Sequence, residues 1–211
     1  MATQETVNQA NAQLINGASC GALRRMIQEV SRDAGKGKLK LQVATTWKGG
    51  VSSDSQVDFL ELAGETLRRE FTIRMDEPPE LFGRNTGPSP QEMLVAAFNA
   101  SMVASYVSAC SLAGVALDKL TIETEGELDL RGSLGLDASV RPGYAQLSYR
   151  VRIRGSGTPQ QFQRSHETVL ATSPNRWNIA NAINLHADLV IETETDACPV
   201  PAPETASRLR G

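Results

Sequence analysis

The sequence is poor in the residues that build covalent or metal-bound frameworks. It holds three cysteines, Cys20, Cys110 and Cys198, which stand far apart and form no C-x-x-C pair. An odd number of scattered cysteines argues against the disulfide framework of small secreted proteins. The two histidines, His166 and His186, have no thiol or carboxylate neighbours at ligand spacing. We therefore expect no metal site, and we expect no cofactor.

Excess charge and long apolar runs are also missing. The net charge is −3, which excludes binding to nucleic acid through bulk positive charge. The longest apolar runs fall short of the ~20 residues that span a bilayer, so we expect no membrane segment. The N-terminal stretch MATQETVNQANAQ lacks the charged start and apolar centre of a signal peptide, which predicts a cytoplasmic protein. With 40% apolar residues, the chain of 211 residues can bury a core of its own.

Alternating apolar residues predict an N-terminal group of strands. Residues 39–47, 51–62 and 66–75 follow a glycine-rich break and are separated by turn residues. We expect them to form a three-stranded antiparallel meander. The next stretch, 76–90, holds four prolines and two glycines and is predicted to be a crossing loop.

Two later strands have opposite charges on their outward faces. In residues 120–130 the outward positions are acidic, whereas in residues 147–154 they are arginines. We expect these strands to pair and to set the two charges beside each other, rather than to bind a phosphate backbone. A last strand is predicted at 185–194.

Helices are predicted from periodicity and capping residues. The first runs from about residue 7 to 30, with a break at NGASCG. The second spans 90–112, with Ser89 as cap and Pro90 at its start, and the third spans 158–171. The mixture of helices and antiparallel strands predicts an α+β fold.

Polar hydroxyls lie along one face of the second helix. At about 100° per residue, Ser101 shares a face with Phe98, Ser105 and Ser108, which we expect to be the face turned to the core. Two interpretations stay open. The hydroxyls either bond back to the preceding turn in a closely packed helix or line a ligand pocket.

Several segments resemble the OsmC/Ohr superfamily of osmotically induced and organic-hydroperoxide-resistance proteins. They are LFGRNTGPSPQEMLVAAFNASM, LDLRGSLGLDASVRPGYAQLSYRVRI and SPNRWNI, while LINGASCGALRRMIQEV and TTWKGG are similar to a branch with an N-terminal helix. The resemblance covers roughly residues 14–194. It implies an intertwined homodimer whose antiparallel sheets wrap two central helices. The implied domains are an N-terminal helical extension (1–36), an OsmC-like domain (37–196) and a disordered tail (197–211).

The resemblance also implies a site between the two subunits. A peroxidatic cysteine on the first central helix attacks the peroxide and becomes a sulfenic acid, which condenses with a second cysteine. An arginine and a glutamate activate the thiol. In this sequence the two cysteine positions fall at Ser101 and Ser173, and the glutamate position falls at Gln91. The arginine has no clear counterpart, although Lys48 and Arg84 are nearby cations.

A serine hydroxyl supplies no thiolate near pH 7 and cannot be oxidised to a sulfenic acid. Our leading hypothesis is a homodimer without peroxidase activity that keeps a pocket for a small, partly apolar or peroxide-like molecule. The pocket would be lined by Gln91, Ser101, Ser173, Arg176, Phe98 and Trp177.

Two alternatives remain open. One is a thiol-dependent organic hydroperoxide reductase that uses Cys110 or Cys198. The other is a structural dimer whose pocket is filled by side chains. Cys110 lies on the opposite side of the helix from Ser101, so we expect a buried and inert thiol there.

Overall fold

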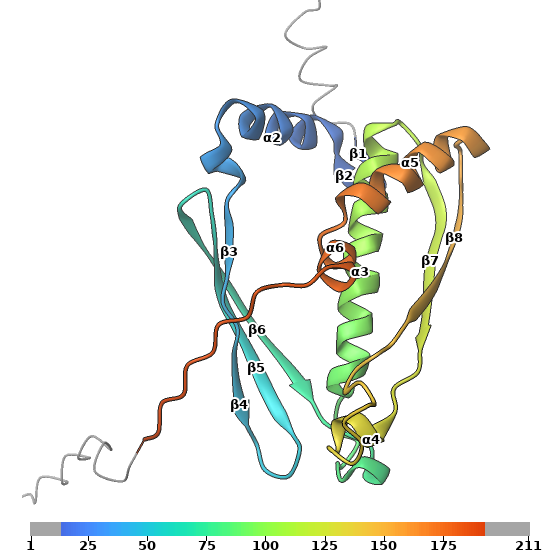
Figure 1. Ribbon diagram of the computed structural model, residues 1–211. Helices are drawn as coiled ribbons and strands as arrows, with labels where there is room; N and C mark the ends of the chain where they lie inside the picture. The colour runs from blue at the N-terminus through green and yellow to red at the C-terminus, as the bar shows by residue number, and fades with distance from the viewer. Residues whose placement is uncertain (1–13, 193–211) are drawn as a thin grey trace, which may run out of the picture. The chain divides into compact units, whose positions relative to one another are not determined.

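The computed structural model describes residues 14–192. Helices and antiparallel strands are both present, which confirms the α+β class (Figure 1). The chain divides into two compact units, of which the first runs to Asn181 and the second begins at Ala182. The domain boundaries expected from the family resemblance stay a prediction.

A short hairpin opens the described chain. Strands β1 (Leu14–Ile15) and β2 (Ala18–Ser19) are joined by Asn16 and Gly17, which both have positive φ, as a tight hairpin turn requires. Helix α2 (Cys20–Arg32) follows at once. The side chain of Ser19 accepts a hydrogen bond from the first turn of α2. The predicted break at NGASCG is therefore confirmed, and the helix that follows it begins at Cys20. The first part of the predicted helix, residues 7–13, lies outside the described residues.

The hairpin is fastened to the end of the central helix. The amide Nδ2 of Asn16 donates to Ser111 Oγ at 3.1 Å and to the Val115 carbonyl at 2.9 Å. Its Oδ1 accepts from the Leu117 N–H at 2.7 Å. The Cys20 thiol donates to the Ser111 carbonyl. One asparagine thus satisfies two backbone groups in the connection between the central helix and the next strand.

The next unit is an antiparallel sheet with β5 at its centre. The strand β5 pairs on one edge with β3 and β4 in succession, and on the other edge with β6. The expected meander is confirmed, with its first strand interrupted at Gln42 and Val43. The elements are η1 (Ala34–Gly37), β3 (Leu39–Leu41), β4 (Ala44–Trp47), β5 (Ser53–Leu62) and β6 (Glu65–Met75).

The predicted crossing loop is organised around one buried carboxylate. Asp76 accepts hydrogen bonds from the N–H groups of Glu77, Arg84 and Thr86, and from the Thr86 hydroxyl. The Thr86 hydroxyl is the largest of the effects that lower the pKa of this carboxyl group. The loop also contains the short helix η2 (Pro79–Leu81).

The central helix α3 (Pro90–Leu112) begins as expected. Ser89 and Glu92 form a capping box, and Pro90 occupies the first position. The core row on this helix consists of Phe98, Met102 and Tyr106. The predicted core face is thus correct for Phe98 but not for the serines, since Ser101, Ser105 and Ser108 are only half-buried. The bulky side chains take the core contact because burying them removes more apolar surface from water.

Length and composition would let α3 cross a membrane, and it alone among the described residues meets both criteria. This does not contradict the expectation of no membrane segment, because serines interrupt the apolar runs of α3 and only its average hydropathy is high. Core helices of globular proteins meet the same criteria, and α3 packs against β7 (Leu117–Gly126) and two later helices (Figure 1).

The two oppositely charged strands pair as predicted. In β7 and β8 (Leu147–Gly155), Glu123 lies opposite Arg150 and forms an ion pair of 3.3 Å with Arg152. Asp118 lies 3.8 Å from Arg154. The acidic row is shorter than expected because β7 ends at Gly126. The following helix α4 (Leu130–Ser133) is capped by Asp129, whose carboxylate pairs with Arg131 instead. The inner faces of both strands pack on the core.

Two helices close this part of the chain. Helix α5 (Pro159–Thr172) has Thr158 as its cap, as predicted. A second helix, α6 (Pro174–Ala180), follows it and is not among the helices predicted from the sequence. Ser173 lies between them in an extended conformation, and Pro174 suits the first position of the new helix.

The last predicted strand is absent from the part of the chain that the structure describes. Residues 182–192 carry no strand, although five large apolar side chains there are exposed. A strand requires a neighbour that pairs with its backbone N–H and C=O groups, which the alternation of apolar residues does not supply by itself. The rest of that strand, the predicted tail and Cys198 lie outside the described residues.

Candidate functional site

Two serines that the family resemblance singled out lie beside each other. The hydroxyl oxygens of Ser101 and Ser173 are 3.4 Å apart, although one belongs to α3 and the other to the α5–α6 junction. Ser173 is fully buried and Ser101 is half-buried. The fold thus brings together two of the three residues expected to mark the former catalytic positions.

Asn175 fixes this arrangement from the start of α6. Its backbone N–H donates to Ser101 Oγ at 3.3 Å, and its Nδ2 donates to the Ala97 carbonyl at 2.9 Å. Because Ser101 accepts from Asn175, the Ser101 hydroxyl proton is available to Ser173. Sequence reasoning missed Asn175, although it sits two positions after Ser173 in the same segment.

An open cavity of about 380 Å³ adjoins the serine pair. The hydroxyl of Ser105 bonds back to the Ser101 carbonyl at 2.9 Å, which confirms the packing interpretation for that residue. The remaining wall mixes small and hydroxyl-bearing side chains, so the interpretation as a ligand pocket stays open as well. The lining residues are Ser101, Ala104, Ser105, Ser108, Ala109, Leu112, Thr168, Thr172 and Pro174.

Phe98 and Arg176 lie at a different cavity, of about 470 Å³. The Phe98 ring meets Tyr149 edge to face at 5.3 Å between centroids. Arg176 donates through Nε to the Tyr149 hydroxyl at 3.4 Å and through Nη1 to the Leu170 carbonyl at 2.7 Å. Trp177 is 56% exposed and lines neither cavity. Within one chain, therefore, Phe98, Arg176 and Trp177 do not line the cavity beside the serine pair.

The other expected groups also lie away from the serines. Gln91 is exposed in the first turn of α3. Its neighbour Glu92 accepts from the Ser89 N–H at 2.7 Å, and this hydrogen bond lowers the pKa of the Glu92 carboxyl group. Lys48 and Arg84 are exposed and line neither cavity. The capping box therefore uses the only carboxylate in the first turn of α3.

Cys110 is fully buried, as expected. Burial raises the pKa of its thiol, while a hydrogen bond with Ser165 acts in the opposite direction. A buried thiol with a raised pKa supplies little thiolate, so this geometry does not favour a reductase that uses Cys110. Within residues 14–192, no group of three or more histidine, cysteine and acidic side chains could hold a metal ion.

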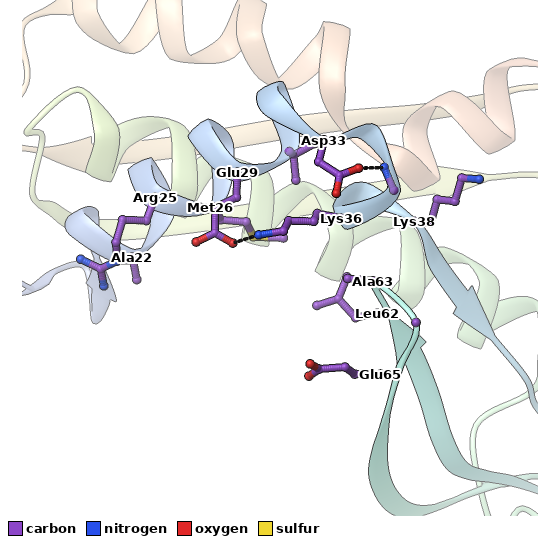
Figure 2. A pocket seen from close by; sticks show the side chains of 13 residues that line it. Ala22, Arg25, Met26, Glu29, Asp33, Lys36, Lys38, Leu62, Ala63 and Glu65 are labelled. Carbon is purple, nitrogen blue, oxygen red and sulfur yellow. Dashed lines mark hydrogen bonds and ion pairs between the residues drawn. The ribbon is translucent and has the colours of Figure 1, made fainter.

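A larger hollow, of about 770 Å³, lies between α2 and the β5–β6 hairpin (Figure 2). Three of its charged side chains form close contacts within the lining itself. Lys36 forms an ion pair of 3.3 Å with Glu29, and Asp33 accepts from the Gly35 N–H. None of the residues expected at the site lines it, so the serine pair remains the candidate site.

Comparisons with known proteins show which family this chain is similar to. The OsmC-like protein family matches residues 83–188. No curated protein matches the chain. The structure is similar to an OsmC-like protein from Mycoplasma pneumoniae, with 13% identity, a TM-score of 0.52 and coverage of 67% of this chain and 87% of that one. It is also similar to an OsmC-like protein of unknown function from Vibrio cholerae O1, with 15% identity, a TM-score of 0.50 and coverage of 65% and 91%. The two likenesses show a shared fold, and the match over half of the sequence shows that the chain belongs to the OsmC-like family.

Proposed function

We propose that this protein is a homodimeric OsmC-like protein without thiol peroxidase activity, which binds a small, partly apolar or peroxide-like molecule beside Ser101 and Ser173. The observation that carries the proposal is the distance of 3.4 Å between the two hydroxyl oxygens. Two groups that react in sequence must be neighbours, and here the neighbours are serines.

Without thiols at Ser101 and Ser173, the thiol peroxidase reaction cannot take place at these positions. A peroxidatic thiolate attacks one peroxide oxygen, releases an alcohol and becomes a sulfenic acid, which a second thiol converts to a disulfide with loss of water. A serine hydroxyl is not deprotonated near pH 7, and it cannot be oxidised to a sulfenic acid. Cys110 does not replace the lost group, because it is buried within the core face of α3.

The adjoining cavity supports ligand binding over a pocket filled by side chains. Its volume of about 380 Å³ is within the range of small-molecule sites. Ser101 and Thr172 offer hydroxyls, whereas Ala104 and Leu112 offer apolar contacts. A molecule with one polar group and a short apolar body fits this lining.

Exposed apolar surface supports a dimer. Leu41, Trp47, Leu185 and Leu189 are between 65% and 89% exposed in the single chain. Only 22% of the most apolar stretch of α3 is buried. Surfaces this apolar are normally covered by another protein. A second copy is the partner we propose, and a cytoplasmic location is consistent with the buried free thiols of Cys20 and Cys110.

Peroxidase activity is tested with tert-butyl hydroperoxide and dithiothreitol. We expect the wild type to turn over peroxide no faster than a variant in which Cys20, Cys110 and Cys198 are all changed to serine. Faster turnover by the wild type would overturn the claim that thiol chemistry has been lost.

Ligand binding is tested with 1-hexanol as a probe. We expect it to raise the melting temperature of the wild type but not that of Ser105→Leu, which fills the cavity. The matched control is Ser31→Leu, an exposed position on α2 that should keep the response. An equal response of all three proteins would show that the probe does not bind beside Ser101.

The dimer is tested by light scattering on the full chain. We expect twice the chain mass of 22.7 kDa. Leu189→Asp should shift the protein toward the monomer, because it places a charge on exposed apolar surface. A wild type that is monomeric at micromolar concentration would contradict the dimer.

A further inference from the structure

A groove of about 620 Å³ lies between α5 and β8, where the serine-lined cavity does not reach. It shares no lining residue with that cavity. Its walls combine cationic, aromatic and aliphatic side chains from four elements. Those that carry the argument are Tyr106, Arg150, Ile153, Phe162, His166 and Arg176.

Two guanidinium groups at this groove lack acidic partners. Among the ion pairs formed within residues 14–192, none includes Arg150 or Arg176. The neighbouring outward arginines, Arg152 and Arg154, are both paired with carboxylates. Arg176 is held by two neutral groups, the Tyr149 hydroxyl and the Leu170 carbonyl. The groove therefore has two guanidinium groups in its lining that form no ion pair, although Glu123 lies opposite Arg150 on the paired strand.

His166 adds an imidazole to the lining of the groove. The buried Tyr106 hydroxyl is hydrogen-bonded to His166 Nδ1, which fixes the position of the ring. Burial is the main cause that raises the pKa of Tyr106 to about 12, so the phenol keeps its proton at neutral pH.

The rest of the lining is apolar. Val151, Ile153, Phe162 and Leu170 contribute aliphatic and aromatic surface from β8 and α5. Glu167, the acidic residue on the same helix, accepts a hydrogen bond from Gln163 and does not line the groove. The site therefore offers two guanidinium groups, of which Arg176 is held by hydrogen bonds, beside an apolar wall.

We propose that the groove between α5 and β8 binds a small organic carboxylate with an aromatic or aliphatic body. The carboxylate lies between Arg150 and Arg176, where guanidinium groups bind it by charge-assisted hydrogen bonds. The apolar body packs on Ile153 and Phe162. This site is separate from the serine pair and does not depend on the function proposed for it.

The test uses 4-phenylbutyrate as the probe, with its uncharged amide and acetate as the two controls. Imidazole resonances report the location, because the chain has only two histidines and His186→Gln assigns them. We expect saturable shifts of the His166 signals with 4-phenylbutyrate and not with the amide or acetate. Equal shifts with the amide, or no shift at millimolar acid, would overturn the proposal.

Variants test the charge requirement. Arg150→Gln should weaken binding about tenfold, as expected for the loss of one charge-assisted contact. Arg154→Gln changes the net charge equally and lies on the same strand, but it does not line the groove and should bind as the wild type does. Equal weakening by both variants would indicate general charge attraction and overturn the site. If Arg150→Gln does not fold, the comparison of 4-phenylbutyrate with its amide on the wild type still tests whether binding requires the carboxylate.

Discussion

Ser101 and Ser173 place their hydroxyl oxygens 3.4 Å apart across 72 positions of sequence. Asn175, which follows the second serine on α6, holds the contact by bonding to the first serine and to the Ala97 carbonyl. The pair therefore depends on the way α6 is fastened to α3.

The first prediction restores sulfur at both positions. In Ser101→Cys/Ser173→Cys, we expect tert-butyl hydroperoxide to oxidise one thiol to a sulfenic acid, which the other thiol converts to a disulfide with release of water. Thiol titration and peptide mass mapping should find the new bond. Neither single variant should form it. If the double variant retains both thiols under peroxide, the two positions do not preserve a catalytic geometry.

The second prediction concerns the asparagine that fastens the N-terminal hairpin. Asn16→Ala removes three hydrogen bonds to the end of α3 and leaves the Leu117 N–H without its acceptor. We expect the free energy of unfolding to fall by about 1–3 kcal/mol. Urea titration measures the loss, and Asn178→Ala, an exposed position on α6, is the matched control. Equal stability of the two variants would show that the hairpin contributes nothing.

The third prediction is a pH dependence. Hydrogen bonds from the loop lower the pKa of Asp76 below its ordinary value of 3.8. Its contribution to stability is therefore fully present above that value and is lost as the pH falls through the lower folded pKa. Asp76→Asn should remove this contribution, so its difference from the wild type in urea denaturation should shrink toward strongly acidic pH. A difference that stays constant with pH would contradict the prediction.

The fourth prediction compares two methionines. Met102 is completely buried on the core face of α3, whereas Met26 on α2 is 50% exposed. Truncation to alanine should cost about 2–5 kcal/mol at Met102, because it leaves a cavity. At Met26 the cost should stay within about 0.5 kcal/mol. Thermal and urea unfolding of both variants would show the contrast, and a larger loss at Met26 would place the core elsewhere.

Local signals predicted much of the chain. Ser89, Pro90 and Glu92 mark the start of α3, and Thr158 with Pro159 marks α5, since capping groups bond within their own turn. The charge pattern predicted the pairing of β7 with β8, because alternation along each strand determines which side chains face outward. Errors arose where a choice depended on distant partners. The helix α6 and the unpaired residues 182–192 are the main cases.

The sequence by itself determined the α+β class, most element boundaries and the absence of sulfur at two positions, because these depend on composition and on neighbours along the chain. Only the tertiary structure decided that Ser101 and Ser173 meet, that Arg176 donates to Tyr149, and that Tyr106 is hydrogen-bonded to His166. Each of these contacts joins elements remote in sequence. Their geometry follows from how helices and sheet pack around Phe98 and Met102, which no local pattern encodes.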